Sequence, residues 1–468
     1  MESSGEPPNP HILARLSYWL LLLVVALAPL PFGSNRPWAW SLLSLGVAAL
    51  IIVWAIAAII DANTIQLSWG RYRPLLILFG LFIGWSCFQA LAPVPKQFWA
   101  PGWEQVAALG GPSTGVISTD PEQSLTAVMC LLAYAGIFWL GMQVGRRTHY
   151  ANLALWSIAL AGLAYALYGI IVQLEGSNTI LWFPKWSYKY SLTSTFVNRN
   201  HFAIYAGLAI LCTLALIANE ARKATEASIA TRSGFIQFLD NMTLQIVVLA
   251  ITFMVLATAL LLTQSRAGAM MTVIGVVAFL AVLATTSTFA AKSTIRFGLV
   301  ILIAGGIFGV ISGSLLISRI ADVAENMSER MTVYKTTLQA ISDRPLLGFG
   351  LGSFPNVYPS YRGAEFSPND ATYDYANNIY LQLALESGLV GAVLLLLSVA
   401  LVTSVCVWGA RQRHRNGFFA ALGVAATVLV GGHGLLDFSL QIPAIAATYC
   451  LILGVAYAQA WSTGPLER

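Results

Sequence analysis

Residues 38–60 read WAWSLLSLGVAALIIVWAIAAII, an apolar stretch that contains no charged side chain. A helix needs about 20 residues to cross the hydrocarbon core of a bilayer, because each residue advances it by about 1.5 Å. This stretch is therefore long enough to span a membrane, and stretches of the same kind recur along the whole chain. They predict about twelve spans, near residues 15–32, 38–60, 74–93, 123–143, 151–173, 200–219, 244–263, 268–287, 297–317, 379–407, 417–436 and 443–462.

The composition of the 468-residue chain excludes an ordinary soluble domain. Hydrophobic residues make up 57% and charged residues 10%, with a mean hydropathy of +0.72, whereas soluble domains average about 25% charged residues. The chain is therefore predicted to be an all-α integral membrane protein. Its five cysteines lie inside predicted spans without disulfide or metal-site spacing, so they are interpreted as small buried apolar residues: Cys87, Cys130, Cys212, Cys406 and Cys450.

The first span has a second interpretation as a cleaved signal peptide, because Arg15 precedes its apolar run. Glu2 and Glu6 in the preceding tail disfavour this interpretation, and no small-x-small cleavage site follows the run. We therefore expect a membrane span at this position.

Lysine and arginine residues in the short loops predict the orientation of the chain. Loops that face the cytoplasm carry an excess of these residues, and one alternating set of loops holds about twice as many as the other. If that set is cytoplasmic, both termini are cytoplasmic, and the loop at residues 175–199 and the turn at Arg266 lie outside. The net charge of +5 reflects these basic flanks and requires no nucleic-acid partner. The cytoplasmic set comprises Arg71, Arg73, Arg146, Arg147, Arg222, Lys223, Arg232, Lys292, Arg296, Arg411, Arg413 and Arg415.

A polar segment at residues 319–378 interrupts the apolar pattern and divides the chain. It separates nine predicted spans in residues 1–318 from three in residues 379–468, and the predicted orientation places it outside. A long extramembrane segment can hold specific chemistry that lipid-facing helices cannot, so we expect function there. Its first part carries apolar residues at spacings of three and four, which predicts an amphipathic helix lying on an apolar surface. These residues are Ile320, Val323, Met327, Met331, Tyr334, Leu338 and Ile341.

The amphipathic helix is expected to end at Asp343, because Pro345 disfavours helical geometry in the residue before it and cannot continue the hydrogen-bond ladder. Three alternating glycines follow in LGFGLGS, residues 347–353, and permit tight turns. No Gly-Lys-Ser/Thr follows, and the spacing misses the dinucleotide fingerprint, so a nucleotide-binding loop is excluded. The segment is interpreted as a turn-rich connector packed by Phe349 and Phe354.

Three arginines on the predicted outer face are candidates for binding an anion. Arg199 lies at the mouth of one span, Arg266 lies between two spans, and Arg330 lies on the amphipathic helix. A guanidinium group is costly to hold at a membrane surface unless it meets an anion, and its planar fork matches two phosphate oxygens. A diphosphate lipid headgroup would satisfy all three side chains. Each arginine by itself could equally extend to the interface or pair with a carboxylate.

Several short motifs occur in a fixed order between the predicted spans. They are TFVNRNHF at residues 195–202, Ser265-Arg266, Arg330, ISDRPLLGFG at residues 341–350, NNIYLQ at residues 377–382, ESGLVG at residues 386–391 and HGLLDF at residues 433–438 with Gln441-Ile442-Pro443. In this order the chain resembles the bacterial O-antigen ligase and Wzy-type polymerase superfamily. The motifs span most of the chain, and their joint order is more specific than any one of them.

This resemblance implies a GT-C-like membrane glycosyltransferase of the bacterial inner membrane, with a large helical periplasmic loop. Such an enzyme moves a preassembled glycan from undecaprenyl diphosphate to an acceptor on the periplasmic side, with inversion at the anomeric carbon. It uses no nucleotide sugar, no cofactor and no obligatory metal. Because the periplasm has no nucleotide pool, the donor is activated by a lipid leaving group, and arginines can stabilise the charge that develops on it.

By position, the resemblance assigns Arg199, Arg266 and Arg330 to the family's diphosphate-handling arginines. Ligases of the superfamily usually have a His-Asn pair where this chain has Asn377-Asn378. An asparagine cannot act as a general base, so Asn377 is expected to orient a sugar hydroxyl by hydrogen bonds. The base is then either lacking or supplied by another residue.

Four other side chains could supply this base, and each has a structural alternative. Asp374 could reach the site or merely form a turn, and Glu386 could instead pair with an arginine. His433 and Asp437 are expected one helical turn apart, either as an oriented imidazole or as a structural pair. His201 could simply face the membrane interface.

Residues expected to contact the glycan complete the predicted site. Tyrosines at the headgroup level could stack on sugar rings, although aromatic residues are common there without a ligand. The substrate-binding candidates are Asn198, His201, Tyr358, Tyr361, Asn378, Glu386 and His433, and the catalytic candidates are Arg199, Arg266, Arg330, Asp374 and Asn377.

The predicted function is that of a Wzy-type polysaccharide polymerase, because the histidine replaced by Asn377 belongs to the ligase pattern. An O-antigen ligase acting on lipid A-core is the first alternative. A transporter or flippase of lipid-linked glycan is the second, although transporters carry ionisable groups at mid-membrane, whereas polar residues here gather at the outer face. The expected partners are an undecaprenyl-diphosphate-linked glycan, a glycan or lipid A-core acceptor, membrane lipid and envelope-assembly proteins.

Overall fold

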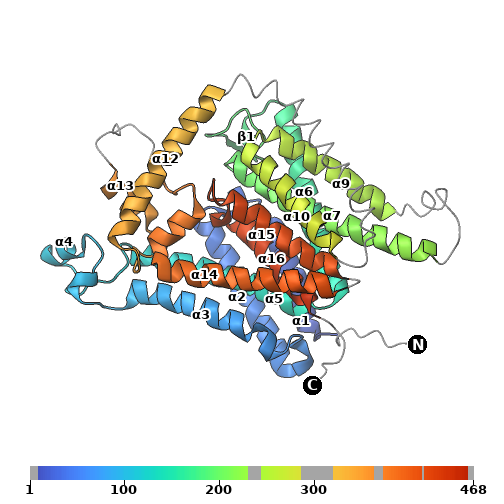
Figure 1. Ribbon diagram of the computed structural model, residues 1–468, viewed down its shortest axis with the longest axis horizontal. Helices are drawn as coiled ribbons and strands as arrows, with labels where there is room; N and C mark the ends of the chain where they lie inside the picture. The colour runs from blue at the N-terminus through green and yellow to red at the C-terminus, as the bar shows by residue number, and fades with distance from the viewer. Residues whose placement is uncertain (1–8, 230–243, 286–319, 363–372, 414–415, 462–468) are drawn as a thin grey trace.

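The computed structural model describes residues 9–229, 244–285, 320–362, 373–413 and 416–461, which form a bundle of α-helices (Figure 1). One short antiparallel hairpin, β1 (Thr179–Ile180) with β2 (Phe183–Pro184), is the sheet within these ranges. Nine helices of this part are long and apolar enough to cross a membrane. They are α2 (Pro37–Ile60), α3 (Trp69–Leu91), α5 (Pro121–Val144), α6 (Thr148–Leu174), α7 (Arg199–Ile229), α9 (Leu244–Leu262), α10 (Arg266–Ala284), α14 (Ile379–Gln412) and α16 (Pro443–Ala460).

Two shorter apolar helices, α1 (Ile12–Leu27) and α15 (Gly417–His433), accompany these nine. The predicted spans thus coincide with helices, and the all-α membrane fold is confirmed. The span near residues 297–317 lies outside the described residues. Between the apolar helices are α4 (Trp103–Ala108), α12 (Ile320–Asp343), α13 (Phe354–Tyr361) and the short 3-10 helices η1 (Phe32–Ser34), η2 (Ala62–Thr64), η3 (Lys96–Phe98) and η4 (Ser439–Gln441).

Helix α16 forms the centre of the bundle. It packs most extensively against α5 and also contacts α15, α14 and α6. Its side chains are buried on every face of the helix, in an Ala-rich sequence that has no polar stripe. A helix that is apolar all round belongs in an interior, and small side chains let neighbouring helices approach closely in a membrane.

One end of the bundle carries the extramembrane elements. Figure 1 shows α4, α12 and α13 gathered there, and we call it the α12 end. Helices α7, α10 and α14 begin at this end, while α15 and α3 finish there. The opposite end is where α14 and α16 finish and α15 begins. The polar segment of the sequence therefore lies over one set of helix ends.

The predicted amphipathic helix corresponds to α12, and its end at Asp343 is confirmed. Its predicted apolar face was wrong at Met331 and Leu338, which are 47% and 51% exposed, whereas Ile341 packs against a small core beside α13 and α14. The side chains of Ile320, Val323 and Met327 lie outside the described part of the structure. Among the described side chains of α12, those of Val333, Thr336, Thr337 and Ala340 are buried, and Val333 and Ala340 belong to this core. These smaller side chains let α12 lie close to α14, and the Thr337 hydroxyl is satisfied by Val333 O at 2.7 Å.

The glycine segment after α12 packs against α14 at a point where the helix is interrupted. Gly388, inside α14, has φ 65° and ψ 172°, a conformation that is practically reserved for glycine. This break leaves backbone groups of α14 without hydrogen-bond partners inside the helix. The residues after α12 provide partners for these groups. Leu389 N donates to Pro345 O at 2.8 Å, and Gly350 N donates to Glu386 O at 2.8 Å.

Phe349 and Phe354 are both buried, which confirms that they pack the connector. They belong to a core under α12 that is separate from the main bundle. Gln89 of α3 ties the connector to the bundle, because its Nε2 donates to Leu347 O at 2.5 Å. The extramembrane elements are therefore anchored to α3 and α14.

Candidate active site

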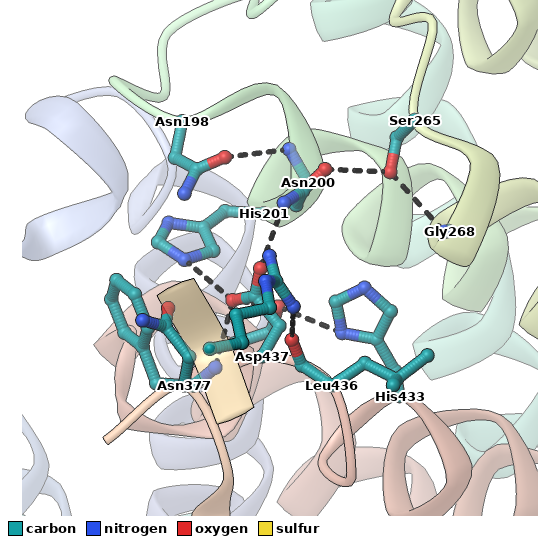
Figure 2. A network of polar contacts seen from close by, with 12 residues as sticks. Asn198, Asn200, His201, Ser265, Gly268, Asn377, His433, Leu436 and Asp437 are labelled. Carbon is teal, nitrogen blue, oxygen red and sulfur yellow. Dashed lines mark hydrogen bonds and ion pairs between the residues drawn. The ribbon is translucent and has the colours of Figure 1, made fainter. Parts of the chain in front are cut away.

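The carboxylate of Asp437, in the turn after α15, is the centre of a polar network at the α12 end (Figure 2). Asn200 Nδ2 donates to Asp437 Oδ2 at 2.8 Å, Phe438 N donates to Oδ1 at 2.7 Å, and His201 Nε2 lies 3.3 Å from Oδ1. Burial alone would raise the pKa of this carboxyl. The close contact with His201, the nearby His433 ring and the hydrogen bond from Asn200 nevertheless hold the pKa of this carboxyl well below its usual range. Asp437 is therefore an anion in the folded protein.

Asn200 links the starts of α7 and α10 to this carboxylate. Its Oδ1 accepts a hydrogen bond from Ser265 Oγ at 2.8 Å, and its backbone N donates to Asn198 Oδ1 at 2.8 Å. Ser265 also caps α10, because its Oγ accepts from Gly268 N at 3.2 Å. With the oxygen of its amide directed to Ser265, Asn200 turns the NH₂ group toward Asp437.

Two imidazoles lie on either side of Asp437 in Figure 2. His201 is buried, and its ring meets Phe438 edge-on with 4.7 Å between the ring centres. His433 reaches Asp437 indirectly, because Ser439 Oγ lies 3.1 Å from His433 Nδ1 and 3.4 Å from Asp437 Oδ1. The expected separation of one helical turn between His433 and Asp437 was wrong, since α15 ends at His433 and the chain turns there.

Tyr375 also packs against Phe438. The two rings are stacked, with 4.0 Å between their centres and an angle of 11° between their planes. Burial raises the pKa of the Tyr375 phenol to about 12, and the nearby charge of Asp374 adds to this effect. The phenol therefore remains neutral at physiological pH and can donate a hydrogen bond.

Arg330 on α12 and Arg199 at the start of α7 both act on this region. Arg330 Nη1 donates to the carbonyl oxygen of Leu436, directly before Asp437. The Arg199 guanidinium lies over the ring of Tyr188, 5.3 Å from its centre. Burial and the charge of Asp437 raise the pKa of the Tyr188 phenol, and the charges of Arg199 and Arg330 lower it. The charges of Asp437, Arg199 and Arg330 thus all act on the phenol of Tyr188.

Arg266 is the first residue of α10 and follows Ser265, and its side chain is exposed. Arg199 is likewise the first residue of α7. The N-terminus of a helix carries about half a positive charge, so each arginine adds to a positive potential instead of neutralising one. The Asn200–Ser265 hydrogen bond holds these two helix starts together, which favours the binding of an anion between or beside them.

Asn377 and Asn378 approach the same turn through the start of α14. Asn378 caps α14 by accepting a hydrogen bond from Tyr380 N at 3.0 Å, and its Nδ2 donates to Leu435 O at 3.1 Å. Asn377 has a positive φ of 52°. Its carbonyl oxygen lies 2.9 Å from Tyr334 Oη, which is also 3.2 Å from Leu435 O. Asn377 is thus held through its backbone next to the turn that carries Asp437.

Two predicted sugar-stacking residues lie elsewhere. The prediction for Tyr358 was wrong, because this side chain is 2% exposed and stacks on Phe354 at 5.2 Å within the extramembrane core. Tyr361 donates a hydrogen bond from Oη to Asp343 Oδ2 at 2.8 Å, at the end of α12. Both tyrosines stabilise α12 and α13 and do not line the Asp437 network.

The two predicted carboxylates, Glu386 and Asp374, also do not contact Asp437 among the described residues. Glu386 is buried, and its Oε1 accepts a hydrogen bond from Gln382 Nε2 at 2.8 Å. Its position beneath the glycine segment indicates a structural role. Asp374 is exposed, near Tyr375. Neither carboxylate is therefore part of the Asp437 network.

Three residues of the network were missed from the sequence, namely Asn200, Ser265 and Ser439. Asp437 was considered solely as a partner of His433. Asn200 and Ser265 belong to the motifs TFVNRNHF and Ser265-Arg266, so their position in these motifs could have identified them as candidate site residues. No spacing along the chain indicates that they meet Asp437. Among the described residues, no group of three His, Cys, Asp or Glu side chains could hold a metal ion.

A comparison with protein-family models matches residues 251–396 to the family described as O-Antigen ligase. The matched region contains Arg266, Arg330 and Asn377, whereas His201 and Asp437 lie outside it. No curated protein matches the chain. The network therefore joins the matched region to the helices that precede and follow it.

Proposed function

We propose that this multi-pass membrane protein is a polysaccharide polymerase, because residues 251–396 match the O-antigen ligase family model, in agreement with the resemblance to the O-antigen ligase and Wzy-type superfamily. It moves a glycan from undecaprenyl diphosphate to the end of an acceptor glycan, with inversion at the anomeric carbon. The reaction takes place at the α12 end, which faces the periplasm of the bacterial inner membrane. The polar segment at residues 319–378 provides the extramembrane part of this site.

The observation that carries the proposal is the contact between His201 and the ionised Asp437. His201 Nε2 faces the carboxylate at 3.3 Å, so the tautomer that suits both groups carries its proton on Nε2 and a lone pair on Nδ1. Such an imidazole can accept the proton of an acceptor hydroxyl while Asp437 stabilises the imidazolium that forms. His201 thus takes the role of base that Asn377 cannot have.

The arginines take the role of stabilising the leaving group. As the acceptor oxygen bonds to the anomeric carbon, the bond from that carbon to the diphosphate oxygen breaks, and its electron pair leaves with the diphosphate. Arg199 and Arg266, at the starts of two helices, and Arg330 on α12 supply positive charge for this anion. Because these groups are held in place before the reaction, little reorganisation is needed when the charge develops.

Two alternatives are supported less well. An O-antigen ligase that transfers glycan to lipid A-core would use the same chemistry, and Asn377, in place of the ligase histidine, favours the polymerase. A transporter of lipid-linked glycan would bind its substrate near the middle of its helices. The network of Asp437 instead lies where α7, α10 and α14 begin. This position favours a reaction at the membrane surface.

The test uses the purified full-length protein and an undecaprenyl-diphosphate oligosaccharide, with and without lipid A-core. A ladder of longer glycans formed without lipid A-core is the expected result, because a polymerase uses its own substrate as the acceptor. Transfer that requires lipid A-core would indicate the ligase. If neither reaction occurs and the oligosaccharide crosses liposomes instead, the protein is a transporter and the enzymatic proposal is wrong.

A matched pair of histidine variants tests the site separately from the reaction. His201→Asn should abolish ladder formation, whereas His149→Asn, at an exposed position at the start of α6 on the opposite end, should leave it unchanged. Both variants should remain in the membrane at wild-type amounts. Wild-type turnover in His201→Asn would remove the His201–Asp437 pair from the mechanism without affecting the assignment of the reaction.

A further inference from the structure

An open groove with a volume of about 720 Å³ runs along α14 toward the opposite end of the bundle. It is lined by residues of α14 between Leu396 and Gln412 and by Thr427 of α15, and we call it the α14 groove. Small side chains such as Ala400 and Ser404 form part of its wall. Since α14 is apolar and long enough to cross a membrane, the groove is located at the depth of the lipid chains.

The wall of the α14 groove suits a hydrocarbon chain. The hydroxyl of Thr403 donates to Val399 O at 2.8 Å, and that of Thr427 donates to Gly423 O at 2.9 Å. These hydroxyls are satisfied within their own helices, so they do not require a polar ligand. The other side chains along the groove are mainly apolar, and its outer edge includes Trp408, which is 46% exposed.

The opposite end of the groove is cationic. Arg411 and Gln412 line it there, next to Trp408. The Trp408 ring packs against that of Trp461 at 5.3 Å, and the guanidinium of Arg71 lies 5.1 Å from the centre of the Trp461 ring. The groove therefore leads from a lipid-facing apolar wall to a group of arginines, by way of two tryptophans.

Two further arginines strengthen this positive potential. Arg146 Nη1 donates to Ala458 O at 2.5 Å and to Trp461 O at 2.6 Å. Burial lowers the pKa of Arg146 to about 9, and the charges of Arg71 and Arg413 contribute to the decrease. Burial is the main cause of the decrease, and repulsion from the guanidinium groups of Arg71 and Arg413 adds to it. A bound anion would relieve that repulsion.

We propose that the α14 groove is a binding site for an anionic phospholipid. An acyl chain lies along the groove, and the phosphate meets Arg411 within the positive potential of Arg71, Arg146 and Arg413. Basic residues between membrane helices are a recurring way to recognise acidic headgroups, and the tryptophans are suited to the interface between chains and headgroups.

This site is separate from the one proposed for the glycan donor. Helix α14 begins after its cap at Asn378 and ends beside Arg413, and the part after the break at Gly388 alone corresponds to about 36 Å of helix, more than the thickness of a bilayer core. The headgroup of the phospholipid and the diphosphate of the donor would thus lie in opposite leaflets. The proposal therefore does not depend on the glycosyltransferase assignment.

The test measures lipid binding to the purified full-length protein by native mass spectrometry, with phosphatidylglycerol and phosphatidylcholine of identical acyl chains. Phosphatidylglycerol should bind in preference to phosphatidylcholine. Arg411→Ala should weaken binding of phosphatidylglycerol about tenfold, as expected for the loss of one charge-assisted contact. Ala400→Phe should weaken it as well, because the larger ring fills the groove without changing the charge.

Arg222→Ala is the matched control, because it removes the same charge near the end of α7, outside the groove. It should retain wild-type binding of phosphatidylglycerol. Phosphatidylglycerol with brominated chains should also quench tryptophan fluorescence less in Trp408→Phe than in the wild type. Equal binding of both lipids, or unchanged binding in both Arg411→Ala and Ala400→Phe, would overturn the proposal.

Discussion

A single side chain, that of Asp437, joins helices that are far apart in the sequence. Its hydrogen bond with Asn200 connects residues separated by 237 positions. A buried carboxylate is costly unless it is hydrogen-bonded and paired, and here Asn200, Phe438 N and His201 meet that need. The same contacts that keep Asp437 ionised therefore hold the start of α7 against the turn after α15.

Replacing Asp437 by Asn should lower the glycan-transfer rate by about 10²- to 10⁴-fold, the usual contribution of an acid–base group. The shape of the side chain is retained, but the charge that stabilises a protonated His201 is lost. The rate should be measured as the initial rate of ladder formation by purified protein. The control is Asp343→Asn, which should retain activity. Asp343 is another carboxylate at the α12 end, and it accepts a hydrogen bond from Tyr361. A similar loss in both variants would argue against a specific role for Asp437.

The depressed pKa of Asp437 predicts how acid affects stability. Its unfolded pKa is about 3.9, and its folded pKa is lower. Stability from this carboxylate is therefore fully present above about pH 4 and is lost as the pH falls through the folded pKa. The difference in apparent Tm between wild type and Asp437→Asn should narrow between pH 5 and pH 3. The corresponding difference for Ser439→Ala, which removes no titratable group, should stay constant; a gap for Asp437→Asn that widens in acid would contradict the assignment.

At the level of single residues, the sequence indicates which side chains are candidates for a site but not which of them contact one another. The arginines, His201 and His433 were selected as candidates because charges and imidazoles are rare in such an apolar chain. Their contacts depend on how distant helices pack, which no local spacing encodes. The error for His433 and Asp437 shows this limit, since four positions equal one helical turn only while the helix continues.

At the scale of elements, α14 and the glycine segment form one structural unit. Gly388 interrupts α14, and the segment after α12 restores the missing hydrogen bonds through Pro345 O and Gly350 N. The break lies ten residues after Asn378, the cap of α14 that binds the Leu435 carbonyl. The position of the cap relative to the network therefore depends on this break.

Gly388→Ala should lower the apparent Tm and the amount of folded protein. Its positive φ disfavours any side chain, which costs about 1–3 kcal/mol, and a Cβ atom would lie 2.1 Å from Leu346 O. The measurement is the thermal denaturation of the detergent-solubilised protein. Gly46→Ala is the control, because a Cβ atom there would meet nothing within 4 Å. An unchanged Tm for Gly388→Ala would mean that the segment is not held against the break.

Elements were the most predictable level of this fold. Spans follow from hydropathy, because a membrane helix must satisfy its backbone internally and expose apolar side chains to lipid. The end of α12 followed from Pro345. The buried face of α12 followed in part: Ile341 packs against the core, but the small residues Thr337 and Ala340 are buried while Leu338 is exposed. The extramembrane helix α4 also had no periodic signal long enough to predict it.

At the scale of the whole molecule, the two ends of the bundle have different chemistry. The α12 end carries the Asp437 network and the starts of α7 and α10, and the opposite end carries Arg71, Arg146 and Arg413. Basic residues in short loops are retained in the cytoplasm. The opposite end is therefore predicted to be cytoplasmic, and the α12 end periplasmic.

Cysteine labelling tests this orientation directly. Leu109, after α4 at the α12 end, is 88% exposed, and the side chain of Lys223, near the end of α7, is 54% exposed. A membrane-impermeant maleimide should label Leu109→Cys in intact spheroplasts, whereas Lys223→Cys should be labelled after permeabilisation alone. The native cysteines are buried or half-buried, so the unsubstituted protein should give little background. The reverse pattern would place the Asp437 network on the cytoplasmic side, where a periplasmic glycan could not reach it, and the proposed polymerase would then be excluded.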